Sequence, residues 1–165
     1  MHDEARAHRH RRPGNDRRLC KCGCLRVQQP HHRDCSSTEP PQPQGGTVED
    51  GTYVLEAFTH YGGCPTAPEI SNTTWSICGD HWDVAQVVPM NSENVDAGLL
   101  PILRLDFAAT FQGASVSLAL SCEPSNTSAS SLAARGYTAS STSLTFIYPD
   151  PNTDGAIEVS HYARQ

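Results

Sequence analysis

The sequence lacks the motifs and long apolar segments by which most enzymes and membrane proteins are identified. Its 165 residues contain no Walker loop, no Gly-x-Ser-x-Gly, no His-Glu-x-x-His and no dinucleotide-binding glycine motif. No run approaches the roughly 18 consecutive apolar residues of a membrane-spanning helix. The start of the chain has no apolar leader after its basic residues, so the chain as written predicts a cytoplasmic protein. We therefore expect no enzymatic activity, catalytic residue, cofactor or metal ion, with a small hydrolase as the alternative.

Basic residues are scarce beyond the first 35 positions. Residues 1–35 carry nine Lys and Arg against four acids, a net charge of +5, whereas residues 36–165 carry three against fourteen, a net charge of −11. The acidic part would repel a phosphate backbone, so we expect no nucleic-acid partner. Residues 1–34 are rich in Arg, His and Pro and cannot bury a core, which predicts a disordered tail. Residues 35–46 predict a Pro/Gln/Gly linker, which leaves one domain over residues 47–165.

The domain consists of short segments with apolar side chains at every second position, separated by Gly, Pro, Asn and Asp. This pattern predicts half-buried strands. The eight predicted strands are residues 52–61, 73–78, 81–88, 102–111, 114–122, 136–139, 143–148 and 156–164. Gly79-Asp80 and Gln112-Gly113 predict tight hairpin turns. No segment keeps a helical period, and only residues 130–134 could hold one turn of helix.

The alternation also assigns side chains to the two faces of a strand. In the first strand it places Tyr53, Leu55, Ala57 and Tyr61 on one face. In the strands 102–111 and 114–122 the predicted inner residues are Leu103, Leu105, Phe107, Ala109, Phe111, Val116, Leu118, Leu120 and Cys122. Arg104 and Asp106 then lie on the outer face, or line a polar pocket of the barrel.

Eight antiparallel strands predict an all-β fold. An open sheet would leave two unpaired edges, whereas closure into an up-and-down barrel removes both. A barrel of about eight strands has an interior that side chains fill or that holds one small ligand. A two-sheet β-sandwich is the alternative that the sequence leaves open.

Four groups of residues carry a resemblance to a known family. They are Asp50-Gly51-Thr52-Tyr53-Val54-Leu55, Gly79 before His81-Trp82-Asp83-Val84, the hairpin of Gly136-Tyr137-Thr138-Ala139 with Leu144-Thr145-Phe146, and the terminal His161-Tyr162-Ala163-Arg164-Gln165. Over residues 47–165 the chain resembles lipocalin-like (calycin-type) small β-barrels, in particular uncharacterised bacterial secreted lipoproteins of that build. The resemblance implies an eight-stranded barrel in the cell envelope, with a small apolar ligand or an envelope protein as its candidate partner.

The same resemblance gives the N-terminal part a second interpretation. Cys35, followed by Ser36, Ser37 and the linker, stands where bacterial lipoproteins carry their lipidated cysteine, so Cys35 is the lipidation candidate. Residues 30–34 are not an apolar leader, and we hypothesise that residues 1–34 arise from a frame or start-site error. Upstream DNA with no apolar leader in any frame would refute this. The native product would then be secreted or envelope-attached, with membrane contact only through the lipid anchor.

The cysteines offer candidates for one disulfide, which an oxidising compartment would favour, but no well-spaced metal site. Cys64, Cys78 and Cys122 lie in the domain and are disulfide candidates, with all three pairings open and a buried free thiol as the alternative. In the tail, Cys20, Cys22 and Cys24 are separated by single residues, closer than the usual paired zinc ligands. We therefore predict no metal site there.

The candidate functional residues are aromatic or histidine side chains of the predicted strands. Four aromatic side chains are candidates for lining a ligand cavity, with ordinary core packing as the alternative; they are Trp75, Trp82, Phe107 and Phe111. His81 and Asp83 share a strand face and predict an exposed pair. We favour a structural or protein-interaction role for the barrel, and keep lipocalin-like binding of a small hydrophobic ligand as the alternative. A hydrolase would need His60, His81 or His161 to converge with acids in a cleft.

Overall fold

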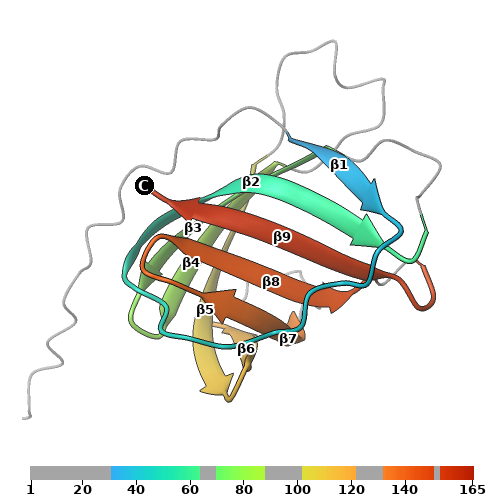
Figure 1. Ribbon diagram of the computed structural model, residues 1–165. Helices are drawn as coiled ribbons and strands as arrows, with labels where there is room; N and C mark the ends of the chain where they lie inside the picture. The colour runs from blue at the N-terminus through green and yellow to red at the C-terminus, as the bar shows by residue number, and fades with distance from the viewer. Residues whose placement is uncertain (1–30, 64–69, 88–101, 122–131, 151–152) are drawn as a thin grey trace, which may run out of the picture.

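The computed structural model describes residues 31–63, 70–87, 102–121, 132–150 and 153–165, and in this part of the chain every regular element is a strand (Figure 1). The nine strands are β1 (His31–Ser36), β2 (Gly51–Tyr61), β3 (Ile70–Cys78), β4 (His81–Val87), β5 (Ile102–Gln112), β6 (Ser115–Leu120), β7 (Leu132–Ala139), β8 (Ser143–Pro149) and β9 (Ile157–Arg164). The all-β prediction is confirmed. None of the described residues forms a helix that is long and apolar enough to cross a membrane. The sequence allowed one turn of helix at residues 130–134. Within the described residues this is wrong, because β7 begins at Leu132.

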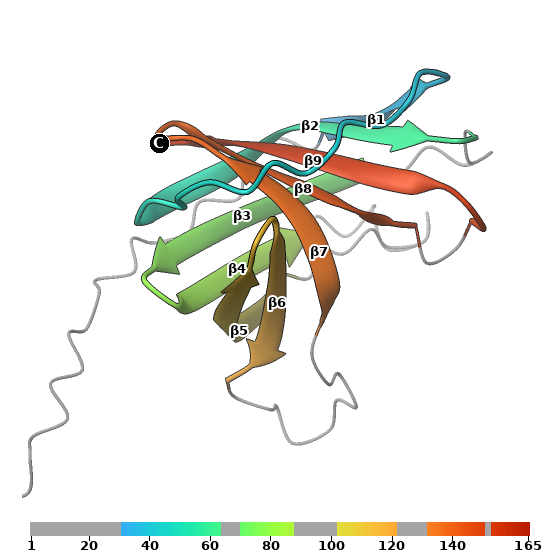
Figure 2. The ribbon, with the colours of Figure 1, turned by 60° about the horizontal axis from the view of Figure 1, so that its bottom comes forward.

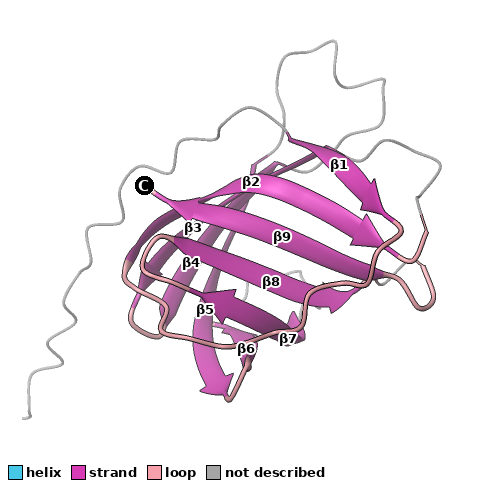
Figure 3. Ribbon diagram, in the orientation of Figure 1, coloured by secondary structure: helices cyan, strands magenta, loops and turns pink. Residues whose placement is uncertain are grey.

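Strands β2 to β9 form a closed antiparallel barrel. Each strand pairs with the next one along the chain, and β9 pairs back with β2, from Tyr53↔Arg164 to Tyr61↔Ile157. Figures 2 and 3 show these strands wrapping around a common interior. The closure confirms the up-and-down barrel and excludes the sandwich. Gly79, with a φ of 59°, takes the left-handed conformation that the tight β3–β4 hairpin requires.

β1 is a ninth strand that the sequence pattern did not predict. β2 and β3 pair directly only where residues 51–54 face residues 74–77. Beyond that point β1 lies between them: its residues 33–36 run parallel to residues 58–61 of β2, and its first two residues pair with the start of β3. The predicted boundary between a tail and a linker at residues 34 and 35 therefore needs correction, since it falls inside this strand. Residues 1–30 lie outside the described part of the chain.

The segment that connects β1 to β2, residues 37–50, is called the strap here and crosses the outside of the barrel (Figure 1). Gly45 N–H donates to the Tyr137 carbonyl oxygen, and Ala139 N–H donates to the Gly45 carbonyl oxygen, each at 2.8 Å. The Tyr137 hydroxyl donates to the Gly46 carbonyl oxygen at 3.1 Å. The segment is extended, as the linker prediction expected, but it is hydrogen-bonded to β7 instead of being a free spacer.

A β-bulge in β2 decides which of its side chains enter the barrel. In the pairing with β9, Leu55 faces Tyr162 and Ala57 faces His161, so Glu56 is an extra residue without a register partner. One inserted residue reverses the alternation beyond it. Phe58 and His60 are consequently buried on the inner side, and the prediction that Ala57 and Tyr61 share the inner face of Tyr53 and Leu55 is wrong.

Aromatic and aliphatic side chains fill the barrel. Trp75 contacts the rings of Trp82, Phe107 and Phe146 at centroid distances of 5.9, 6.1 and 5.6 Å. Phe107, Leu118 and Phe146 are almost fully buried, and Leu105 packs against them partly buried. The inward phase predicted for the middle of β5 and β6 is therefore confirmed. Edge-to-face ring contacts of this kind add to the stabilisation that burial of the rings already provides.

Candidate functional site

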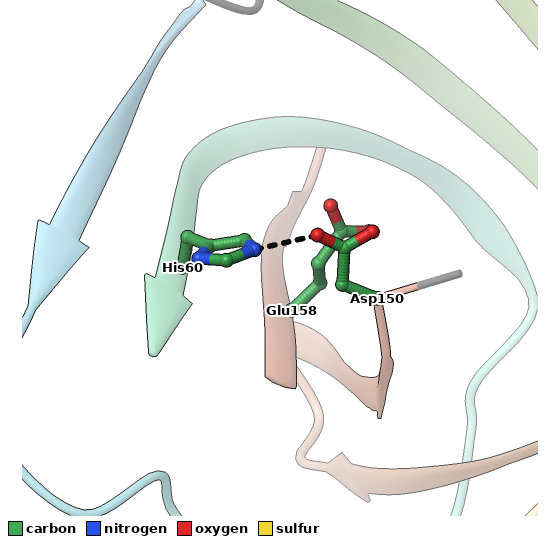
Figure 4. Close-up of side chains that lie close together, drawn as sticks. All are labelled: His60, Asp150 and Glu158. Atoms are coloured by element: carbon green, nitrogen blue, oxygen red, sulfur yellow. Dashed lines mark hydrogen bonds and ion pairs between the residues drawn. The ribbon is translucent and has the colours of Figure 1, made fainter. Parts of the chain in front are cut away.

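Three polar side chains, those of His60, Asp150 and Glu158, lie together inside the barrel at the end of β2 (Figure 4). His60 and Glu158 are cross-strand partners in the β2–β9 pair. On its other side, Glu158 faces Tyr148 of β8. Asp150 follows two residues after Tyr148, and side chains two apart point to the same face. The bulge at Glu56 completes the group, because it turns His60 inward.

The group is buried and closely spaced. His60 is 0% exposed, Asp150 7% and Glu158 6%. His60 Nε2 lies 2.7 Å from Asp150 Oδ2, and one ligand atom from each of the three side chains lies within 4.8 Å of the other two. Within the described part of the chain, His60 Nδ1 is buried without a hydrogen-bond partner. The site thus offers an imidazole nitrogen and two carboxylates, groups that carry protons and bind metal ions.

The wall beside this cluster is polar and hydrogen-bonded. The Tyr148 hydroxyl lies 3.2 Å from Ser160 Oγ. The guanidinium of Arg135 stands over the Tyr148 ring, with its carbon 4.3 Å from the ring centroid, a cation–π contact. Burial raises the pKa of both Tyr148 and Tyr162. Both phenols therefore keep their protons at neutral pH, and this part of the interior differs in kind from the aromatic core.

A second cluster lies on the outer face of β4 and β5. Asp83 and Asp106 are cross-strand partners, and His81 Nε2 lies 3.1 Å from Asp106 Oδ2. The side chains of His81 and Asp106 are 50% and 30% exposed. The expected pair of His81 and Asp83 thus includes Asp106 as a third member, and Arg104 is exposed beside it. Among the described residues, His161 joins neither cluster.

The four aromatic cavity candidates occupy two different environments. Trp75, Trp82 and Phe107 are at most 3% exposed and pack in the interior. Phe111 is 42% exposed, and its ring rests against Trp82 and Tyr137 at centroid distances of 5.8 and 5.3 Å. Three of the candidates therefore belong to the packed core, and Phe111 covers Trp82 from the surface.

The cysteine predictions can be followed at two positions. Cys35 lies in β1 and Cys78 ends β3, and neither is a free thiol. A sulfur atom that is already bonded cannot carry a lipid, so the structure gives no support to lipidation of Cys35. Cys64 and Cys122, the other disulfide candidates, lie outside the described residues.

A surface pocket of about 710 Å³ lies on the outside of the barrel near the buried cluster. Its lining includes Cys35, the first residues of the strap, Tyr61 and Ile157. Tyr61 and Ile157 are cross-strand partners, and each adjoins in sequence a member of the pair His60 and Glu158. Because neighbouring side chains on a strand point to opposite faces, one layer of sheet separates the pocket from the cluster.

The sequence pattern does not identify Asp150 or Glu158, and it offers His60 only as one of three histidines. Regular alternation along β2, without a bulge, predicts that His60 lies on the outer face. One signal was present: Glu158 and Ser160 are in phase with Tyr162, the largest side chain of β9, and this phase places Glu158 inward.

The closed barrel is compatible with the lipocalin-like architecture that the sequence resembles. No protein-family model, no curated protein and no solved structure matches the chain.

Proposed function

We propose that the protein is an exported barrel with a structural or protein-interaction role, acting through its outer surface. The observation that carries this proposal is the filled interior, where Trp75 alone contacts three other aromatic rings. A carrier of small hydrophobic molecules needs a cavity on the order of 300 Å³ or more, lined mainly by apolar side chains. Here the apolar side chains suited to such a lining pack against one another.

Exposed apolar side chains on β5 supply a surface for a protein partner. Ile102 and Leu103 are 45% and 40% exposed, on opposite faces of the strand. They begin β5 in a stretch that pairs with β4, whereas β6 pairs with β5 only over residues 107–112. Among the described residues, the β6-facing edge of this stretch has no strand partner. An edge of this kind, unpaired within the described residues, is suited to the addition of a strand from another protein.

A ligand-binding experiment separates this role from that of a lipocalin-like carrier. One sample of the purified full chain is extracted with organic solvent, and the extract is examined for bound lipid by mass spectrometry. A second, unextracted sample is titrated with a fluorescent fatty-acid analogue. Trp75 and Trp82, the two tryptophans of the chain, report on the interior. We expect no co-purifying lipid and no saturable quenching of tryptophan fluorescence. One equivalent of a bound apolar molecule that quenches both tryptophans would refute the proposal.

A second candidate function is small-molecule binding on the outside of the barrel. The pocket of about 710 Å³ favours it, because ligand sites commonly measure about 300–1,000 Å³. A ligand held there would leave the buried tryptophans unquenched. Its binding should be lost in Tyr61→Ser, which removes a lining side chain, and kept in the control Phe111→Ser, which does not touch the pocket.

The export part of the proposal is supported by the cysteines. Cys35 and Cys78 are not free thiols, and we infer that each sulfur is part of a disulfide. They do not bond to each other, because eight residues of β3, about 27 Å of strand, separate Cys78 from the end that meets β1. Alkylation before and after reduction tests this: Cys35 and Cys78 should be labelled only after reduction. Labelling of both in the native, unreduced protein would refute it.

A further inference from the structure

We propose that His60, Asp150 and Glu158 form a binding site for one divalent transition-metal ion, such as Zn²⁺. The three residues come from adjoining strands of the barrel wall, β2, β9 and the end of β8, so the fold holds them in place. One imidazole with two carboxylates is a ligand set that zinc accepts, and a site with three protein ligands leaves a fourth position for water. Imidazole is a ligand that the alkaline-earth ions Ca²⁺ and Mg²⁺ seldom use.

The spacing of the ligand atoms suits a small ion. Zinc lies about 2.0–2.2 Å from nitrogen and oxygen ligands, so tetrahedral neighbours are separated by about 3.4 Å. In the cluster, His60 Nε2 and Asp150 Oδ2 are 2.7 Å apart, and all three ligand atoms lie within 4.8 Å of one another. The required separation is longer than the first distance and lies within the upper limit for the others. Admitting the ion therefore requires His60 and Asp150 to move apart.

Charge gives a second reason for a divalent ion. As metal ligands, the carboxylates of Asp150 and Glu158 are deprotonated and together bring a charge of −2, which a divalent cation balances. Both residues are more than nine-tenths buried, and buried charges in proteins are paired or coordinate metal ions. Two carboxylates this close also repel each other in the metal-free protein, and a bound ion would turn that repulsion into shared attraction.

The hydrogen bonding of His60 identifies the nitrogen that would bind the ion. Its ring is fully buried, and within the described residues Nδ1 has no hydrogen-bond partner. The nitrogen that faces the carboxylates is Nε2. It can bind an ion when the ring proton is on Nδ1, and the ion then takes the place of the hydrogen bond between Nε2 and Asp150.

The exposed cluster on β4 and β5 provides a matched control. His81, Asp83 and Asp106 offer the same kinds of ligand atom. Their side chains stand partly in water, with His81 half exposed, so solvent competes for the ion and weakens the attraction of the carboxylates. We expect the buried cluster to bind the ion much more tightly than the exposed one.

Zinc titration of the full chain tests the proposal. The oxidised protein is freed of metal with a chelator, and binding of Zn²⁺ is measured by calorimetry and by metal content after gel filtration. The same measurements are made on Glu158→Gln, Asp150→Asn and the control His81→Gln. Each amide variant keeps the size of the native side chain and removes one charge, so the metal-free barrel should remain folded, as circular dichroism would show.

We expect one equivalent of Zn²⁺ that is present in the native protein and in His81→Gln. In Glu158→Gln and Asp150→Asn, the affinity for Zn²⁺ should fall by at least roughly 100-fold. Loss of a residue that only hydrogen-bonds to a metal ligand can already cost that much. Ca²⁺ and Mg²⁺ should not displace it. Cysteines and histidines of residues 1–35 can bind zinc as well, and an equivalent held there would survive in both amide variants. The proposal is overturned if every bound equivalent survives in these variants, or if the folded native chain binds none.

Discussion

Truncation of Phe146 is the sharpest test of the filled interior. This ring is 0% exposed and contacts Trp75, Trp82 and Tyr162 at centroid distances of 5.6, 6.1 and 5.7 Å. Replacing a buried phenylalanine by alanine costs about 3–5 kcal/mol through lost transfer free energy and the cavity left behind. Because the ring also makes edge-to-face contacts, Phe146→Ala should cost at least the middle of that range, about 4 kcal/mol.

Phe111→Ala is the matched control for this substitution. Phe111 also contacts two aromatic rings, Trp82 and Tyr137, but it is 42% exposed. Because less of its surface leaves water on folding, its truncation should cost about 1–2 kcal/mol. The difference between the two variants therefore isolates the effect of burial from that of aromatic contact.

Urea unfolding under oxidising conditions, followed by the fluorescence of Trp75 and Trp82, measures both free energies. Oxidising conditions keep the sulfur bonds of Cys35 and Cys78 equal in all variants. We expect Phe146→Ala to lower the free energy of unfolding by at least about 2 kcal/mol more than Phe111→Ala. Equal, small losses in the two variants would mean that the ring at position 146 borders open space, and the argument against an internal ligand cavity would fail.

Two further predictions concern pH and the bulge. Tyr148 and Tyr162 have pKa values raised above 10.0 by burial, so below pH 10 both the folded and the unfolded chain hold these protons. Above pH 10 the unfolded chain releases them first, and stability should fall as pH rises. The part of the tyrosinate absorbance that Tyr148→Phe removes should appear only together with unfolding, and this variant should show less steep alkaline destabilisation. Deleting Glu56 should turn His60 outward and lower the melting temperature strongly. The control Glu56→Ala, an exposed substitution that keeps the bulge, should change stability by about 0.5 kcal/mol or less. Similar melting temperatures for the two variants would contradict the proposed role of the bulge.

Most strands of the barrel were predictable because each repeats an apolar residue at every second position and ends at a turn residue. The hairpin at Gly79 and the inward phase of Phe107 and Leu118 follow directly from this pattern. β1 could not be found in this way. Its sequence, HHRDCS, has no apolar alternation, and it is a strand because the backbones of β2 and β3 offer hydrogen bonds on both sides. Such pairing depends on tertiary structure, which a local pattern does not contain.

The candidate site was less predictable than the fold, for a reason specific to each residue. His60 required knowledge of the bulge at Glu56, which exists only in the pairing of β2 with β9. Asp150 lies beyond the end of β8, where the strand pattern has stopped. Glu158 is a charged residue facing inward, against the usual preference of carboxylates for water. The three come together only after the barrel closes.

The position of β1 has a consequence for the maturation of the protein. If the chain were cut so that Cys35 became its first residue, His31–Asp34 would be lost, which is four of the six residues of β1 and includes both that pair with β3. The shortened protein would have a gap in its wall between β2 and β3, close to His60 on the neighbouring strand. A barrel that includes β1 and a barrel that is anchored at Cys35 after such a cut are therefore two different mature proteins. Mass spectrometry of the mature N-terminus would show which of them the cell makes.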